Sequence, residues 1–331
     1  MNYHVKLYSY KPKEDINEIV EQIGFSNIAI NSKSKKGVAH FFIKLFAAIT
    51  VLIKVRKGDF LLLQYPYKKF YTITCRANHL AGGKTITLIH DLRCFRKKKL
   101  SVKNEIRQLN LSDYVIVHNE SMKRFLEEKG CTSRLICLEI FDYLSSAQTA
   151  VYPTPHEPYC VVYAGGLGSS RNPFLYMLDD HIHNWRMELY GKGFDQEKAT
   201  GWQHIHFNGL YQPDELIRLT EGDFGLVWDG NSMNGCSGNW GEYLKYNNPH
   251  KTSFYLRCGI PVIIWKKAAL APFIAENNCG LVVDNLDEID TRLSSLTREQ
   301  YDEMRNNAFM MRERLTEGFY TKKALNSIIN G

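Results

Sequence analysis

Residues that could bind an anion follow the first strand expected in the second half of the chain. The apolar segment 159–164 leads directly into the turn Gly165-Gly166-Leu167-Gly168-Ser169-Ser170-Arg171. Glycines let the backbone approach an anion closely, and an arginine can bind a diphosphate through two parallel hydrogen bonds. A helix expected from Pro173 would add free N–H groups at its positive end. We therefore expect phosphate contacts from Gly166, Gly168, Ser169 and Arg171, with a purely structural turn as the alternative.

A second group of polar residues lies at the expected start of an apolar helix that ends near Cys258. Asn248 could cap this helix, and Lys251 would lie in its first turn. A diphosphate there would be stabilised by both the ammonium group and the positive end of the helix. The alternative is a solvated cap followed by a core helix. The other candidate ligand-binding residues lie in this polar segment or at two other expected strand ends. They are Tyr190, Asp229, Asn247, Asn248, Lys251 and Thr252.

A histidine and a carboxylate emerge together at the end of an expected strand in the first half. His90 and Asp91 follow the apolar segment 85–89. In that position an imidazole or a carboxylate can remove a hydroxyl proton during nucleophilic attack. Alternatively, Asp91 caps the next helix and His90 lies in the core. Asp229 in the second half is a rival carboxylate, so the sequence leaves open which of these three side chains acts as a general base.

Several motifs of other chemistries are absent from the sequence. No Asp-x-Asp pair is present to hold Mg²⁺ or Mn²⁺ on a diphosphate, so we expect no metal and no cofactor, and cationic side chains that stabilise the leaving group. The glycine turn matches neither GxGxxG nor GxxxxGK[ST], and no GxSxG elbow occurs. The eight cysteines form no CxxC pair, which indicates a reducing compartment without zinc or disulfides.

Short strands alternate with helical patterns in both halves of the 331 residues. Segments such as 60–64 and 115–117 are apolar without alternation, as expected for parallel strands covered by helices on both faces. A stretch with Pro153, Pro155 and Pro158 indicates a linker. We predict an α/β chain with two doubly wound, Rossmann-like domains at 1–152 and 153–315, whose ligands bind at the carboxyl ends of the strands. A C-terminal helix within 316–331 is expected to pack back toward the first domain.

The net charge of +7 is concentrated in two segments. Lysines at 33, 35 and 36 precede the apolar segment 38–53, which is too short to span a membrane. Its spacing predicts a helix whose core-facing residues are Phe41, Leu45, Ala48, Leu52 and Val55. Instead of packing in the core, the segment 33–53 could contact a membrane peripherally. The basic cluster from Arg93 to Lys99 could also face anionic lipid, or it could simply be solvated.

The remaining sequence features limit partners and location. The basic residues lack the interleaved aromatic residues of a base-stacking surface, so no nucleic acid partner is expected. The first residues do not have the pattern of a signal peptide. We therefore expect a cytoplasmic protein, with the inner face of the cell membrane as its site if the basic and apolar segments bind lipid.

Several longer stretches resemble the bacterial galactofuranosyltransferases of polysaccharide assembly. The stretches are 89–93, 115–120, 141–143, 224–230 and 246–251. The segments 211–216 and 251–264 are similar to the glucosyltransferases that modify serine-rich streptococcal adhesins. Both resemblances imply a glycosyltransferase of the GT-B architecture, with two domains facing a central cleft and the nucleotide donor held mainly by the second domain.

The resemblance also implies roles and substrates. Tyr211 and Lys251 would bind the donor, with UDP-galactofuranose the first choice of donor and UDP-glucose the second. The acceptor would be a saccharide linked to a lipid pyrophosphate or to a protein. Retaining enzymes of a large related family have two glutamates seven residues apart, and Phe254 stands where the second would be, which favours inversion. A non-catalytic nucleotide-sugar-binding partner protein is the alternative from another class. The sugar, the acceptor position and the oligomeric state, including a homo-oligomer, stay open.

Overall fold

The chain forms two compact units. The computed structural model describes residues 1–7, 9–30, 37–67, 70–96, 100–150 and 154–331. Unit 1 contains Met1–Asp142 together with Gly318–Gly331, and unit 2 contains Tyr143–Glu317. The sequence placed the division after residue 152, within a stretch of which 151–153 lie outside the described residues. The division in the structure falls earlier, after Asp142, and the last helix belongs to unit 1.

Over the described residues, unit 1 is built on a six-stranded parallel sheet with the strand order β2-β1-β3-β4-β5-β6. In β3 the consecutive residues Leu61, Leu62 and Leu63 are all buried, because helices cover both faces of the sheet. The strands are β1 (Asn2–His4), β2 (Phe25–Asn27), β3 (Phe60–Tyr65), β4 (Lys84–Ile89), β5 (Tyr114–Val117) and β6 (Arg134–Cys137).

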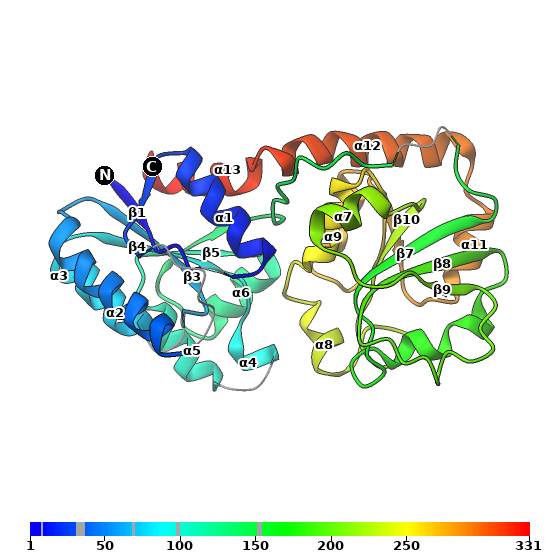
Figure 1. Cartoon of the computed structure of the whole chain (residues 1–331), viewed down its shortest axis with the longest axis horizontal. Coiled ribbons are helices and arrows are strands. Elements are labelled where there is room, and N and C mark those ends of the chain that lie inside the picture. Colours follow the sequence, from blue (N-terminus) through cyan, green and yellow to red (C-terminus); the bar gives the residue numbers. More distant parts are fainter. Residues whose placement is uncertain (8, 31–36, 68–69, 97–99, 151–153) are drawn as a thin grey trace. The chain divides into compact units, whose positions relative to one another are not determined.

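The helices of unit 1 lie on both sides of this sheet. In Figure 1, α1 and α13 lie on one side and α2 and α3 on the other. Gly318, with a φ of 73°, separates α13 from the preceding helix, and a side chain there would meet Ile19 of α1. The helices are α1 (Lys11–Gln22), α2 (Gly37–Lys54), α3 (Tyr71–Leu80), α4 (Arg93–Arg96), α5 (Val102–Leu109), α6 (Glu120–Glu128) and α13 (Phe319–Ile329).

Unit 2 has a second parallel sheet, with six strands among the described residues in the order β12-β11-β10-β7-β8-β9. The order reverses between β7 and β10, which are neighbours although β8 and β9 separate them in the chain. The strands are β7 (Tyr159–Gly166), β8 (Trp185–Lys192), β9 (Ile205–Phe207), β10 (Phe224–Val227), β11 (Val262–Trp265) and β12 (Gly280–Val283). Both units are therefore doubly wound, as the alternation of strands and helices in the sequence predicts.

The longest helix of unit 2 starts with a capping box. The Thr297 side chain accepts a hydrogen bond from the Gln300 N–H, and the Gln300 side chain accepts one from the Thr297 N–H. The helical segments are η2 (Pro173–Met177), η3 (Asp179–His181), α7 (Pro213–Leu219), α8 (Gly238–Tyr243), α9 (His250–Arg257), α10 (Ala271–Glu276), α11 (Glu288–Ser294) and α12 (Arg298–Thr316).

The prediction of which side of α2 lies in the core is wrong in part. Ala48 and Val55 are buried as expected, but Phe41 and Leu52 are about half exposed. The buried side also includes Ala47 and Val51. The helix is apolar around its whole circumference, so hydrophobic spacing alone cannot identify the side that packs on the sheet. Within the described part of the chain, no helix has the length and apolarity needed to cross a membrane.

Candidate functional site

The candidate anion-binding residues of unit 2 lie at the switch point of its sheet. The glycine turn comes at the carboxyl end of β7, and Asp229 follows the carboxyl end of β10. Open α/β sheets bind ligands at this position because the connections on either side of it run to opposite faces and leave a crevice. The sheet therefore brings the turn and Asp229 together although they are separated by about 60 residues.

Lys251, the second residue of α9, points toward the same place. Its Nζ donates to the Tyr163 hydroxyl at 3.0 Å and to the Trp228 carbonyl at 2.9 Å. The distance from Nζ to Asp229 Oδ2 is 3.3 Å, and the lysine side chain is only 10% exposed. A Cβ placed on Gly165 would lie 3.9 Å from Lys251 Cε, so the lysine is adjacent to the glycine turn.

Arg171 supplies a second cation on the other side of Asp229. Its Nη2 is 3.6 Å from Asp229 Oδ1, and its guanidinium lies 4.0 Å from the centre of the Trp240 ring. Cation–π packing of this kind stabilises the guanidinium against the ring. A Cβ on Gly166 would lie only 3.0 Å from Arg171 Nη1, so a glycine at this position leaves room for the guanidinium beside the turn.

The cluster has two basic side chains and one carboxylate. Burial lowers the pKa of Lys251, and the neighbouring Asp229 opposes that shift. Burial also raises the pKa of Tyr163 far above its ordinary range, so its hydroxyl stays protonated. With Lys251, Arg171 and Asp229 charged, the cluster has one excess positive charge in a half-enclosed place. Such an arrangement suits a phosphate or diphosphate group better than a neutral ligand.

Asn172 connects the two loops that form the cluster. Its fully buried side chain donates to the Gly166 carbonyl at 2.7 Å and to the Tyr163 hydroxyl at 3.0 Å. Its amide oxygen accepts a hydrogen bond from the Gly230 N–H at 3.0 Å. Sequence reasoning did not assign Asn172 or Tyr163 to the site. Two features of the sequence could have identified them: Asn172 directly follows Arg171, and Tyr163 lies within an otherwise apolar strand.

Two details of the sequence-based site differ in the structure. The segment after the turn is not an α-helix but the five-residue 3-10 helix η2, followed by the three-residue η3. A segment this short adds little helix dipole, so Arg171 rather than a helix end is the cation of the turn. Asn248 is not the cap of α9, because Pro249 occupies that position and no side chain caps the helix.

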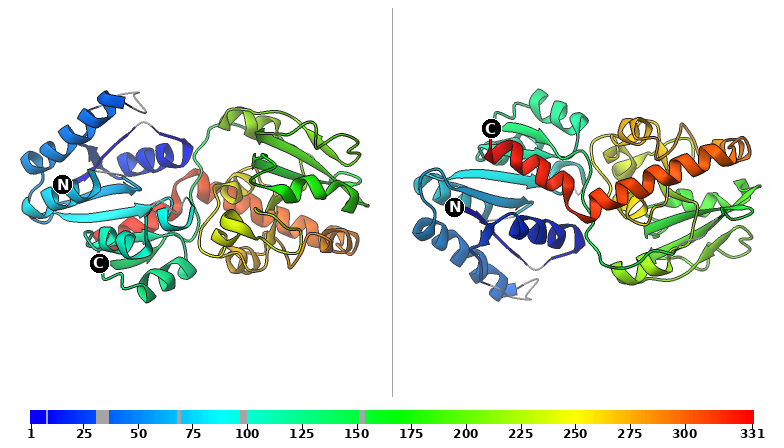
Figure 2. Two further views of the ribbon diagram at one scale, coloured as in Figure 1. Left: turned by 90° about the horizontal axis from the view of Figure 1, so that it is seen from below. Right: turned by 90° about the horizontal axis from the view of Figure 1, so that it is seen from above.

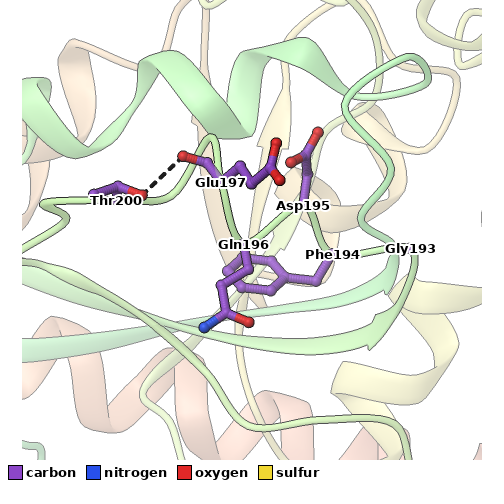
Figure 3. A pocket seen from close by; sticks show the side chains of 6 residues that line it. All are labelled: Gly193, Phe194, Asp195, Gln196, Glu197 and Thr200. Atoms are coloured by element: carbon purple, nitrogen blue, oxygen red, sulfur yellow. Dashed lines mark hydrogen bonds between the residues drawn. The ribbon is translucent and has the colours of Figure 1, made fainter.

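Unit 2 has an open hollow of about 640 Å³, whose lining residues are shown in Figure 3. The residues that line it are Gly193, Phe194, Asp195, Gln196, Glu197 and Thr200, from the loop after β8. Asp195 accepts a hydrogen bond from Ser169 Oγ at 2.9 Å, which links the hollow to the turn. Phe194 stacks on Phe207 with ring centres 4.3 Å apart. The combination of an aromatic ring with amide and carboxylate groups suits a ligand with many hydroxyl groups.

The other candidate residues of unit 2 occupy varied environments. Tyr190 is buried, burial raises its pKa to about 12, and its ring centre is 6.3 Å from that of Tyr211. Thr252 is fully buried on α9, next to Lys251. Asn247 has a buried amide oxygen without a hydrogen-bond partner, and Asn248 is also buried. Across the described ranges, no group of three or more His, Cys, Asp or Glu side chains is placed to hold a metal ion.

His90 in unit 1 lies at the end of β4 and is held by a hydrogen-bond chain. Its Nε2 donates to Gln64 Oε1 at 2.8 Å, and Gln64 Nε2 donates to Asn17 Oδ1 at 2.7 Å. The imidazole stacks on Phe141, with ring centres 5.4 Å apart. Because an amide oxygen can only accept, the hydrogen bond to Gln64 places a hydrogen on Nε2 of the ring.

Asp91 is half-buried and is followed by the four-residue helix α4. The first N–H groups of α4 are bound by Glu105, a residue that sequence reasoning missed. Glu105 accepts hydrogen bonds from the N–H groups of Arg93 and Cys94, both at 2.7 Å, and from the Tyr65 hydroxyl at 2.8 Å. Of the cluster from Arg93 to Lys99, residues 97–99 lie outside the described residues.

Comparison with known families gives matches over both units. The family model described as "Glucosyltransferase 3-like, N-terminal domain" matches residues 3–140, and "Glucosyltransferase 3-like, C-terminal domain" matches residues 161–328. The chain is 30% identical to beta-1,6-galactofuranosyltransferase WbbI of Escherichia coli (strain K12), over all of this chain and 97% of that protein. It is 26% identical to glucosyltransferase 3 of Streptococcus gordonii, over 95% of this chain and 91% of that protein.

Two of the solved structures with the same fold are named as glycosyltransferases of lipopolysaccharide synthesis. The apo form of the outer core galactosyltransferase WaaB matches with a TM-score of 0.65 and 13% identity, over 99% of this chain and 98% of that one. WaaG matches with a TM-score of 0.53 and 12% identity, over 100% and 99% of the two chains. These matches establish the GT-B fold that the sequence resemblance implied.

Proposed function

Since the chain belongs to the glucosyltransferase 3-like family and is a glycosyltransferase of the GT-B fold, we propose that it transfers galactofuranose from UDP-galactofuranose to a saccharide acceptor in surface polysaccharide assembly. The observation that supports this most is the cluster of Lys251, Arg171 and Asp229 at the glycine turn. It offers two cations to a diphosphate at the switch point of unit 2. The choice of galactofuranose is supported by the relative WbbI, whose name gives that activity.

The donor would occupy two neighbouring parts of unit 2. Its diphosphate would bind Lys251 Nζ and the Arg171 guanidinium, because both cations are partly desolvated and interact strongly with an anion there. The hydroxyl-rich nucleoside or sugar would extend into the hollow beside Phe194 and Asp195. We propose that these cations, rather than a metal ion, stabilise the departing UDP.

The transfer step would proceed with inversion. The acceptor hydroxyl oxygen forms a bond to the anomeric carbon while the bond from that carbon to the UDP oxygen breaks, and a base takes the hydroxyl proton. We assign the proton to Asp91, with His90 as its partner in unit 1. Asp229 is less suited, because its carboxylate is already paired with both Lys251 and Arg171.

A glucosyltransferase using UDP-glucose is the second candidate. The relative from Streptococcus gordonii is named glucosyltransferase 3 and aligns over 95% of this chain. The anion site described above serves any UDP-sugar, so it does not distinguish the two donors. We propose that the acceptor is linked to a lipid pyrophosphate and that transfer occurs at the cytoplasmic face of the membrane.

A donor panel tests this proposal. The protein is incubated with UDP-galactofuranose, UDP-glucose and UDP-galactose, and with GDP- and dTDP-linked sugars, and release of the nucleoside diphosphate is measured with and without added saccharide. We expect release from UDP-galactofuranose to exceed that from the other donors. Preference for UDP-glucose would favour the second candidate, the glucosyltransferase. Exclusive use of GDP- or dTDP-linked sugars would refute both candidates. The anomeric configuration of the product, determined by NMR, tests inversion.

A further inference from the structure

Helix α2 of unit 1 exposes large apolar side chains along its outer side. Phe42, Phe46, Ile49 and Ile53 follow one another at spacings of four, three and four, so they form one line along the helix. Phe42 is 58% exposed and Ile53 is 65% exposed. The flanking Phe41 and Leu52 are about half exposed as well. A row of this size is unusual on a free surface and indicates a binding surface.

The inner side of the helix is already used for packing. Ala47, Val51 and Val55 are buried, and α2 packs beside α3. Figures 1 and 2 both show α2 along the outer side of unit 1. The helix α3 also exposes two large apolar side chains, Ile73 and Leu80. The exposed apolar surface therefore includes side chains of both α2 and α3. The buried side of α2 packs against the rest of the unit.

The charge of this part of the chain indicates which partner covers the surface. From residue 22 to residue 58 the sequence contains no Asp or Glu, but it contains Lys33, Lys35, Lys36, Lys44, Lys54, Arg56 and Lys57. Lys54, Arg56 and Lys57, at the carboxyl end of α2, are exposed. Basic residues thus occur in the sequence on both sides of the apolar row. Two copies of the chain paired through α2 would place the exposed Lys54, Arg56 and Lys57 of each copy against a segment that contains no Asp or Glu between residues 22 and 58, which is unfavourable.

We propose that the outer side of α2 is a docking surface for an anionic lipid membrane. Phe42, Phe46, Ile49 and Ile53 would insert into the boundary between head groups and acyl chains, parallel to the membrane plane. Lys54, Arg56 and Lys57 would contact the anionic head groups. This inference goes beyond the proposed function and does not depend on it, because α2 and the anion cluster belong to different units.

Vesicle flotation with the full-length protein tests the proposal. Vesicles of phosphatidylcholine alone are compared with vesicles in which one-third of the lipid is phosphatidylglycerol. We expect binding to the anionic vesicles, weaker binding to the neutral vesicles, and a loss at high salt. The double variant Phe46→Ser/Ile49→Ser removes two exposed side chains and should lower the partition coefficient at least about tenfold. The variant Lys54→Gln/Lys57→Gln should lower binding to the anionic vesicles only.

Two controls make the result specific. Met310→Ser removes a 61% exposed apolar side chain from α12 in unit 2 and should leave vesicle binding unchanged. All variants should keep the far-UV circular dichroism spectrum and the cooperative thermal unfolding of the wild type, which shows that the fold is intact. The proposal is overturned if the wild type does not bind anionic vesicles, or if the Phe46→Ser/Ile49→Ser variant binds them equally well. It is also overturned if light scattering shows a dimer that this variant dissociates, because a second copy would then cover the surface.

Discussion

Replacement of Lys251 by methionine gives the most direct test of the anion site. The side chain is 10% exposed, and its Nζ is 3.3 Å from Asp229 Oδ2 and 3.0 Å from the Tyr163 hydroxyl. Methionine keeps most of the apolar volume but removes the charge. We expect the affinity for UDP to fall, because the cluster changes from one excess positive charge to none.

The magnitude follows from the geometry of the cluster. A unit charge about 4 Å from a phosphate oxygen, at an effective dielectric constant of about 20, contributes about 4 kcal/mol. Desolvation and the competing carboxylate of Asp229 oppose part of this, and charge-assisted hydrogen bonds contribute about 1.5–3 kcal/mol in net terms. We therefore expect a loss of about 2–3 kcal/mol, or about 30- to 150-fold in the dissociation constant of UDP.

The assay is isothermal titration of UDP into the wild type and the variant. Lys266→Met is the matched control. Lys266 belongs to the same unit and also forms an ion pair, at 2.9 Å to Asp284, but its side chain is 63% exposed and does not belong to the cluster. This control should bind UDP unchanged. Thermal unfolding must be measured in parallel, because removing one partner of a buried pair destabilises the folded state. A folded Lys251→Met protein that binds UDP as tightly as the wild type would refute the assignment.

The complementary change at Asp229 separates two roles of the carboxylate. In Asp229→Asn the cluster gains one positive charge, so UDP affinity should rise severalfold if Asp229 only balances the two cations. If transfer is lost while UDP binding rises, Asp229 rather than Asp91 acts as the base. If UDP binding is lost instead, the carboxylate orients Lys251 and Arg171, and its removal disorders them.

Three further predictions concern positions other than Lys251 and Asp229. In Gly166→Val the new side chain would approach the Arg171 guanidinium within about 3 Å, so UDP affinity should fall severalfold by titration while the melting temperature changes little. In Gly225→Ala the added Cβ would lie 2.1 Å from the Tyr255 ring, so denaturant unfolding should show a loss of about 3 kcal/mol. Burial lowers the pKa of His118 to about 4, so its neutral form stabilises unit 1 above pH 6.5 and that stability is lost as the pH falls toward 4. His118→Gln, whose amide can still donate to the Ile89 carbonyl, should remove about 3 kcal/mol of this pH dependence, and an unchanged pH profile would contradict the argument.

The proposed donor site and the proposed lipid-binding surface belong to different units of the chain. The cations that we propose to bind the nucleotide belong to unit 2, and the apolar row on α2 belongs to unit 1. If the acceptor is linked to a lipid, a membrane-docking surface on one unit would bring the enzyme to its acceptor while leaving donor binding on the other unit unaffected. The vesicle and titration experiments measure these two properties separately.

The sequence was sufficient for the fold class, and it identified candidate residues that the structure brings together, although anion binding by them stays a prediction. Uninterrupted apolar strands such as 60–64 require helices on both faces of a sheet, and glycine turns after strands occur where ligands bind. This reasoning, with the family resemblance, identified Gly166, Arg171, Asp229 and Lys251 as candidates. The structure brings these four residues together at the ends of β7 and β10 and the start of α9.

Other features depend on the tertiary structure, because they involve contacts between residues far apart in the chain. Asn172 becomes part of the site only when β7 and β10 are neighbours, and Glu105 caps α4 from another helix. The side of α2 that faces solvent could not be predicted, since every side of the helix is apolar and packing on the sheet decides which residues are buried. Local sequence therefore determines which elements form and which residue types end them, whereas the order of strands in the sheet determines which of those residues meet.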